Sequence, residues 1–193
     1  METTPAVGFS ELAAPAFRHA LPALLEIYQS AKRPPAEQLP GRRDILTEHS
    51  GHPRFRAVVA DVAGEPVGFG YGFHGAPGQW WHDVVGSGIT QATGPHEYGR
   101  WLGDAWELAE LHVRPGWQAR GIGRALLDRL SRGLPERTAV LSTPDVESRA
   151  RRLYRSVGFA DVLTGFFFPG SGEPYAVMGA RLPLAGSGAL SRW

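Results

Sequence analysis

Polar and apolar residues alternate in several short stretches of the chain, and this pattern is typical of β-strands that are buried on one face. Strands are predicted at Ala6–Leu12, Phe55–Ala60, Val67–Phe73, Ala105–Val113, Thr138–Ser142, Phe159–Phe168 and Tyr175–Arg181. The second and third of these strands flank a predicted turn at Ala63–Pro66, and we therefore expect them to form a hairpin.

Apolar residues at helical spacing predict four helices between these strands. The first should begin near Pro22, because proline is favoured at the first position of a helix, and should continue past Tyr28. The others are predicted at Asp44–His49, Gly121–Leu134 and Glu147–Ser156, the last of them stopped by glycine. Because strands and helices alternate in the second half of the chain, the sequence predicts an α/β or α+β sheet domain.

One segment, residues 75–104, has no clear periodicity. It holds seven glycines and three tryptophans over thirty residues, which is long for a plain connection. We therefore expect an insertion at about 75–104 that is functional or has structure of its own. The prediction for the whole chain is a single domain over residues 1–183, followed by a flexible tail over 184–193.

Composition excludes several classes of protein. With 193 residues, of which 42% are hydrophobic and 20% charged, the chain has a globular composition. It contains no apolar run of the ~20 residues that a membrane-spanning helix needs, and its first ten residues have no basic cluster typical of a secretory signal. The absence of cysteine excludes disulfides, thiolate-bound zinc and cysteine nucleophiles. We expect a cytoplasmic protein with no membrane partner.

Charge is balanced overall, at +1, but unevenly distributed. Residues 114–155 contain ten basic and only four acidic residues, which favours a local anionic ligand over a nucleic acid partner. Nineteen of the twenty basic residues are arginine, whose planar fork of donors suits phosphates and carboxylates. A genomic preference for arginine codons is an alternative explanation of this bias.

The stretch Leu111–Leu127 carries the clearest chemical signal. A predicted strand ends, a short polar loop follows, and Gly121 and Gly123 open a helix whose free N–H groups are suited to bind phosphate. No Gly-Lys-Ser/Thr follows, so the stretch is not a P-loop. The third glycine of the dinucleotide fingerprint is also missing.

This stretch resembles a signature of the GNAT superfamily of N-acetyltransferases. The resemblance rests on Gln118-Ala119-Arg120-Gly121-Ile122-Gly123, on the Leu-x-Val-x-Pro lead-in at 111–115, and on the later Ala150-x-x-Leu153-Tyr154-x-x-x-Gly158-Phe159. It implies a mixed, mostly antiparallel sheet of six to seven strands flanked by about four helices. It also implies acetyl-coenzyme A as the cosubstrate, with no metal.

The resemblance also implies which residues hold the coenzyme. The backbone at Leu111–Val113 would pair with the pantetheine arm, and the N–H groups of Arg120–Ala125 would hold the pyrophosphate. The family often has Asn where Glu147 stands, and Ser148 could replace that donor. The implied cofactor residues are Leu111, His112, Val113, Gln118, Ala119, Arg120, Gly121, Ile122, Gly123, Arg124, Ala125 and Ser148.

Acetyl transfer to an amine needs a base and a group that stabilises the departing thiolate. In the family a tyrosine commonly serves the thiolate, and Tyr154 matches it. Glu107 and Glu110 are candidate bases, with Glu107 favoured, and strand alternation would place them on opposite faces. His112 is a third candidate. Alternatively, each of these residues is a packing, paired or solvent-facing residue.

Residues of the 75–104 segment are candidates for the acceptor site. Trp80, Trp81, His82 and Trp101, with Tyr98, could line an aromatic pocket that favours cationic amines. The alternatives are that they pack the insertion against the sheet or form a homodimer contact. The spacing of the histidines and acids there matches no zinc pattern.

The prediction is therefore an N-acetyltransferase that moves an acetyl group from acetyl-coenzyme A to a primary amine by direct attack in a ternary complex. The acceptor is a small molecule or a protein. The alternatives are a non-catalytic acyl-coenzyme A sensor and a partner-binding module that uses the tryptophan-rich segment.

Overall fold

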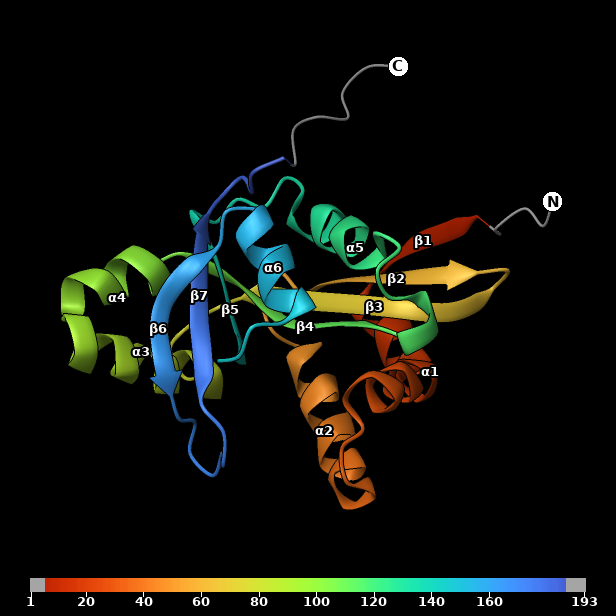
Figure 1. Cartoon of the computed structure of the whole chain (residues 1–193), viewed down its shortest axis with the longest axis horizontal. Helices are drawn as coiled ribbons and strands as arrows, with labels where there is room; N and C mark the ends of the chain where they lie inside the picture. The colour runs from red at the N-terminus through yellow and green to blue at the C-terminus, as the bar shows by residue number, and fades with distance from the viewer. Residues whose placement is uncertain (1–5, 187–193) are drawn as a thin grey trace. The chain divides into compact units, whose positions relative to one another are not determined.

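The structure is a computed structural model that describes residues 6–186 (Figure 1). Its helices and strands fall into two compact units. Unit 1 comprises the chain up to Phe73 together with Ala109–Leu130, and unit 2 comprises His74–Leu108 together with the chain from Ser131 onward. Strand β4 (Ala105–Val113) contributes its first half to unit 2 and its second half to unit 1.

Unit 1 has a three-strand meander at its centre. Its elements are β1 (Val7–Leu12), α1 (Ala14–Lys32), α2 (Leu39–His49), β2 (Arg56–Val62), β3 (Glu65–His74) and α5 (Ile122–Ser131), with 3₁₀ turns at Ala36–Gln38 and Pro115–Trp117. The β1–β2 and β2–β3 pairs are antiparallel. Ala63 and Gly64 both have positive φ, at 52° and 84°, which suits the tight turn of this hairpin.

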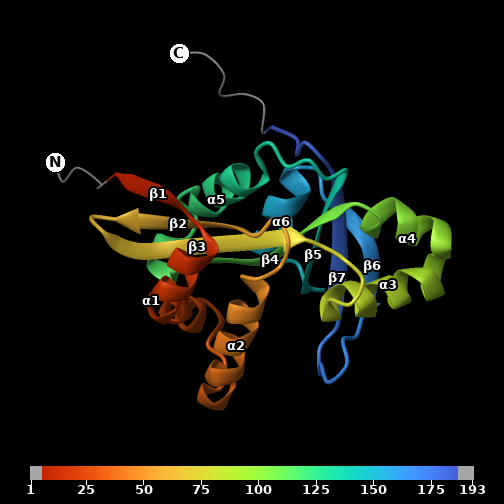
Figure 2. The ribbon, with the colours of Figure 1, turned by 180° about the vertical axis from the view of Figure 1, so that it is seen from behind.

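The strands of unit 1 lie between two helical layers, with α1 and α2 on one face and α5 on the other (Figures 1 and 2). The α1 face buries a cluster that includes Phe17, Leu24, Phe69 and Tyr71. The opposite face of β3 carries glycines. A Cβ at Gly70 would lie 2.9 Å from side-chain carbons of both Leu111 and Leu130, so glycine lets β3, β4 and α5 pack this closely without a shift of those side chains.

Unit 2 combines strands with the segment at 75–104. Its elements are α3 (Trp80–Thr93), α4 (Pro95–Leu102), β5 (Thr138–Pro144), α6 (Arg149–Ser156), β6 (Ala160–Phe166) and β7 (Tyr175–Arg181). Strand β7 lies between β5 and β6 and is antiparallel to both. Helices α3 and α4 cover one side of these strands and α6 lies on the other (Figures 1 and 2).

The complete strand order is β1-β2-β3-β4-β5-β7-β6, a seven-stranded sheet in which β4 and β5 are parallel. The mixed, mostly antiparallel fold predicted from the sequence is confirmed. The described residues form six α-helices where about four were expected, because the 75–104 segment folds into α3 and α4. Among residues 6–186, no helix is both long and apolar enough to cross a membrane.

Several boundaries predicted from the sequence differ from those in the structure; α2, for example, begins at Leu39 where Asp44 was expected. Helix α1 begins at Ala14, with Pro15 in its first turn, and Pro22 lies inside it. The apolar stripe of α1 outweighs the backbone hydrogen bond that an internal proline removes. Leu184, expected in a flexible tail, is buried, and the N–H of Ala185 donates to the carbonyl of Val157 over 3.0 Å. The rest of the predicted tail, residues 187–193, lies outside the described residues.

Candidate active site

The second half of β4 presents a backbone edge in unit 1. The register between β4 and β5 covers Ala105–Glu107 only. Beyond it, β4 neighbours β3, and Arg114 N–H closes this pairing with a 2.8 Å bond to the carbonyl of Val67. Within the described part of unit 1, no strand covers the other edge of Leu111–Val113. This edge could pair with an extended ligand as an added strand would.

The loop after β4 is held by its own side chains. Gln118 Nε2 donates to the carbonyl of Val113 over 3.0 Å, which ties the loop back to the strand end. The Arg120 guanidinium lies 4.7 Å from the centre of the Trp117 ring. Ala119 and Gly121 have φ values of 61° and 79°, and a Cβ at Gly121 would meet no protein atom. The loop is therefore shaped by backbone conformation and is exposed at Ala119–Gly121.

Helix α5 starts from this loop. Its first intrahelical bond runs from Ala125 N–H to the carbonyl of Gly121, over 2.9 Å. A helix leaves its earliest N–H groups without intrahelical acceptors, and Gly121 has no side chain that could cap those of Gly123 or Arg124. The buried side chains of Ile122, Leu126, Leu127 and Leu130 anchor the helix. The positive end of the helix dipole is thus fixed beside the strand edge, which suits a phosphate.

A buried carboxylate lies on β4 in unit 1. Glu110 Oε1 accepts a hydrogen bond from Arg42 Nη1 over 2.8 Å, and Glu110 Oε2 contacts His112 Nε2. Arg42 also lies over the ring of Tyr28, 4.8 Å from its centre, and Tyr28 meets His112 edge to face. Glu110 and His112 therefore share one face of the strand, as the alternation predicts.

The neighbours of Glu110 decide its charge. Burial alone would raise the pKa of this carboxyl, but His112 and Arg42 together hold it below its usual value of 4.5. Glu110 is therefore ionised at neutral pH and already hydrogen-bonded on both oxygens. A carboxylate in this state is a weak proton acceptor but a good partner for a cation.

Glu107, in unit 2, has the opposite electrostatics. Its side chain is 4% exposed, and its Oε2 has no hydrogen-bond partner in the described structure. Burial raises the pKa of Glu107 from 4.5 to about 8. The group is therefore mostly protonated at pH 7 and could gain or lose a proton near neutrality, which is the property required of a general base.

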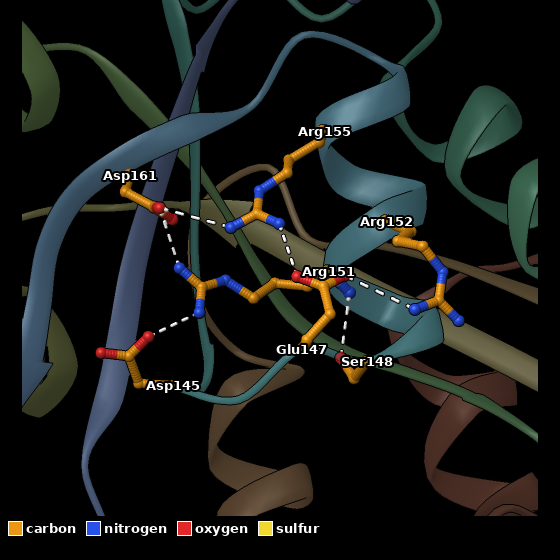
Figure 3. Close-up of polar contacts among 7 residues, drawn as sticks. All are labelled: Asp145, Glu147, Ser148, Arg151, Arg152, Arg155 and Asp161. Atoms are coloured by element: carbon orange, nitrogen blue, oxygen red, sulfur yellow. Dashed lines mark hydrogen bonds and ion pairs between the residues drawn. The ribbon is translucent and has the colours of Figure 1, made fainter.

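Tyr154 lies on the buried side of α6 in unit 2. It is 7% exposed, and its ring centre is 5.8 Å from that of Phe159. Ser148 is the N-cap of this helix, and its hydroxyl accepts from Arg151 N–H over 3.2 Å (Figure 3). Capping uses the oxygen of Ser148 and leaves its hydroxyl hydrogen for another acceptor.

Glu147, at the position where the family often has Asn, is engaged by arginines of α6. Its carboxylate lies 2.7 Å from Arg155 Nη1 and 3.5 Å from Arg152 Nη1, and these contacts are solvent-exposed (Figure 3). The hydrogen bond from Arg155 lowers the pKa of Glu147. Glu147 remains an acceptor, so the amide-type donor expected at this position has to come from elsewhere, such as Ser148.

The tryptophans predicted to line an aromatic acceptor pocket have different surroundings in the structure. Trp81 Nε1 donates to Ser142 Oγ over 2.9 Å, and Trp101 Nε1 donates to Glu97. Trp80 is 60% exposed and stacks on Phe168. The alternative, that these residues pack the insertion, therefore describes Trp81 and Trp101 well.

His82 and Tyr98, two of the predicted acceptor residues, line a cavity of about 450 Å³ between α3 and α4. Its other lining residues are Asp83, Gly86, Ser87, Thr90 and Gln91. Among residues 6–186, no group of three or more histidine or acidic side chains is placed to hold a metal ion.

Sequence reasoning missed the partners of the candidate residues. Arg42 is 68 positions from Glu110, and Arg151 contacts Asp145 and Asp161. In the sequence, nothing distinguishes each of these residues from the other charged residues of a polar helix or loop. No local signal identifies such pairs, because they form only when distant segments fold together.

Comparison with known proteins identifies the family. Residues 21–159 match the family model of the acetyltransferase (GNAT) family. The GCN5-like protein acetyltransferase Rv2170 of Mycobacterium tuberculosis is 41% identical over 131 residues, which span 65% of this chain and 64% of that protein.

Solved structures share the fold. The ribosomal-protein-S18-alanine N-acetyltransferase of Escherichia coli superposes with a TM-score of 0.60 at 20% identity, over 97% of this chain and 100% of that one. An acetyltransferase of Thermus thermophilus gives 0.59 at 18% identity, over 92% and 97%. Since the family model covers well over half of the sequence, the chain belongs to the GNAT family of acetyltransferases.

Proposed function

We propose that the protein is an N-acetyltransferase that moves an acetyl group from acetyl-coenzyme A to a primary amine. The observation that carries the proposal is the uncovered edge of Leu111–Val113 in unit 1, which leads through an exposed loop and Gly121 into the start of α5. An extended amide chain with a pyrophosphate at one end matches a strand edge followed by a helix N-terminus.

The residues fit the coenzyme in distinct ways. Backbone groups of Leu111, His112 and Val113 would pair with the pantetheine arm. The N–H groups from Arg120 to Ala125 would hold the pyrophosphate, and Arg120 and Arg124 would add positive charge. Gln118 and Ala119 would act indirectly, since Gln118 ties the loop to β4 and Ala119 adopts positive φ. Ser148 would offer its hydroxyl hydrogen to the pantetheine arm.

In the proposed reaction, the neutral amine attacks the thioester carbonyl, a C–N bond forms and the C–S bond breaks. Tyr154 would give a proton to the departing thiolate. A base would take the proton that the amine loses, and Glu107 is the first candidate because burial places its pKa near 8. Glu110, held ionised by Arg42 and His112, is the second candidate and is better suited to attract a cationic acceptor.

A protein amino group is the acceptor we place first, ahead of a small amine. The support is the mycobacterial relative, whose name describes a protein acetyltransferase. His82 and the cavity beside it remain candidates for acceptor binding, with Trp81 and Trp101 in packing roles within that segment. We propose a cytoplasmic enzyme, with the exposed Trp80 as the candidate homodimer contact.

The first test is calorimetric titration with acetyl-coenzyme A, coenzyme A and ATP. Micromolar binding of the two coenzymes, with ATP weaker, is expected. Gly123→Trp should abolish this binding by blocking the start of α5. Gly99→Trp is the matched control, because Gly99 is a helical glycine with open space around its Cα and should bind as the parent does. Equal affinity in a folded Gly123→Trp variant would refute the loop assignment.

The second test follows release of the coenzyme thiol with poly-L-lysine and with spermidine as acceptors. Faster turnover on poly-L-lysine supports a protein acceptor, and faster turnover on spermidine supports a small amine. Coenzyme binding without turnover on either amine, and without acetyl-coenzyme A hydrolysis, would point to an acyl-coenzyme A sensor.

A further inference from the structure

Helix α6 has an unusual anchor for a helix that carries a candidate catalytic residue. It is eight residues long, and its buried residues are Arg151 and Tyr154. Most helices are held by an apolar stripe, as α5 is. The helix of Tyr154 is instead held in large part by a buried arginine.

The contacts of Arg151 come from two other segments of unit 2. Its Nη1 lies 2.5 Å from Asp145 Oδ1, just beyond β5, and its Nη2 lies 2.8 Å from Asp161 Oδ2 on β6 (Figure 3). Asp145 is fixed in turn, because its Oδ2 accepts the N–H of Gly165 over 2.7 Å. The Arg151 side chain is 7% exposed. We call these three side chains, Asp145, Arg151 and Asp161, the arginine clamp.

The geometry of the clamp restricts how α6 can move. A guanidinium is planar and its donors have fixed directions, so two carboxylates on separate nitrogens define its orientation. Apolar contacts are non-directional and would allow the helix to slide or rotate slightly. Arg151 and Tyr154 are three residues apart and so lie on the same face of the helix. A rotation of α6 that breaks the clamp would therefore also displace the phenol.

We propose that Arg151 is a positioning residue that sets the place of the Tyr154 hydroxyl through the clamp. Misplacement of a catalytic group by about 1 Å can cost on the order of 10²-fold in rate, so loss of the clamp lowers turnover without touching the coenzyme. The proposal rests on the proposed role of Tyr154 as the group that protonates the thiolate.

The test is a double-mutant cycle between Arg151 and Tyr154, measured as thiol release with the faster of the two acceptors. Arg151→Met should lower kcat by about tenfold or more, and the KM for acetyl-coenzyme A should stay within about twofold. Arg151→Lys should recover little of this loss, because one ammonium cannot reproduce the two-sided fork. In the Tyr154→Phe background, Arg151→Met should cause no further loss of kcat.

The control is Arg152→Met. Arg152 is the next residue in the helix and its side chain is 61% exposed. Within residues 6–186 its ion-pair partner is Glu147, outside the clamp, so this variant should keep the kcat of the parent. If Arg151→Met does not fold, as judged by circular dichroism, Asp161→Asn replaces it, since it weakens one arm of the clamp and leaves Asp145 in place. The same lack of additivity with Tyr154→Phe is expected.

The outcomes separate the two proposals. A parent-like kcat in Tyr154→Phe would refute the role of Tyr154 and, with it, the positioning role of Arg151. If Tyr154→Phe is slow but Arg151→Met multiplies that loss by the same factor as in the parent, Tyr154 keeps its role and the clamp does not act through it. A parent-like kcat in Arg151→Met would also overturn the positioning role.

Discussion

Glu107 and Glu110 lie three residues apart on the same strand, and both are shielded from solvent, yet they have opposite protonation behaviour. Glu110 has a guanidinium and an imidazole as partners, and its pKa lies below 4.5. One oxygen of Glu107 has no hydrogen-bond partner in the described structure, and its pKa is about 8. Burial acts on both carboxyls in the same direction, so their partners decide which of them holds a proton at neutral pH.

The largest effect expected from this difference is on stability. The pKa of Glu107 is raised on folding, so the folded state retains a proton that the unfolded state loses between pH 4.5 and about 8. The free energy of unfolding should therefore fall with pH across this window, by up to ~1.4 kcal/mol per pH unit. Urea titrations at several pH values should show that Glu107→Gln, which does not ionise, lacks this decline. If the free energy of unfolding has the same pH dependence in the parent and in Glu107→Gln, Glu107 is solvated or paired in the folded protein.

The next effect concerns the rate of acetyl transfer. If Glu107 is the base, kcat should rise with pH toward a plateau above about 8, and Glu107→Gln should lower the plateau by about 10²-fold, the lower end of general-base contributions. A pH series of initial rates at saturating acetyl-coenzyme A checks this. In Glu110→Gln, kcat should still rise with pH up to about pH 8, as in the parent; we call this rise the basic limb. If the basic limb is lost in Glu110→Gln and kept in Glu107→Gln, Glu110 would be the base and Glu107 would not.

A smaller change is expected when the charge of Glu110 is removed. Glu110→Gln loses the charged partner of Arg42 and His112, and hydrogen bonds to charged groups contribute about 1.5–3 kcal/mol each at most. We expect the free energy of unfolding at pH 7 to fall by about 2 kcal/mol, measured by urea denaturation. Arg42→Gln should lower the free energy of unfolding by nearly as much as Glu110→Gln does. The double variant should lower it by less than the sum of the two single effects. Full additivity would show that the ion pair contributes nothing.

The smallest effect is expected from Arg42→Lys. Lysine keeps the charge beside Glu110 but loses the planar stacking on Tyr28, and exposed or half-exposed pairs contribute about 0.2–1 kcal/mol. The urea midpoint should shift slightly, and the pH–rate profile should match that of the parent. A change in the profile as large as that of Glu110→Gln would show that the fork geometry of Arg42, beyond its charge, controls Glu110.

The elements that could be predicted from the sequence are those with strong local signals. The predicted bounds of β4 (Ala105–Val113) and β7 (Tyr175–Arg181) agree with the structure, because each is a stretch of largely apolar residues bordered by turn residues. The coenzyme loop predicted at 118–125 also rests on a local signal, since its glycines and its lead-in are contiguous in the sequence; its role stays a prediction.

The helices within 75–104 were missed because their glycines look like breakers. In the structure, Gly86 and Gly88 lie inside α3, and a Cβ on either would meet a ring, of Tyr98 at 2.8 Å and of Phe166 at 2.4 Å. These glycines are present because aromatic side chains occupy the space beside them. Which rings those are depends on tertiary packing, as do the pairing of Arg42 with Glu110 and the arginine clamp, and no local pattern encodes it.

The close packing at Gly70 affects how natural variation in this protein should be interpreted. A side chain there would come within 2.9 Å of carbons of Leu111 and Leu130 and within 3.1 Å of the Glu110 carbonyl oxygen. Substitution would therefore force the leucine side chains, or the strand on which Glu110 lies, to shift. A saturation mutagenesis screen would score this glycine as intolerant as a residue that touches substrate. Invariance at this position among homologues would therefore record a steric requirement, and a search for catalytic residues by conservation alone would select it wrongly.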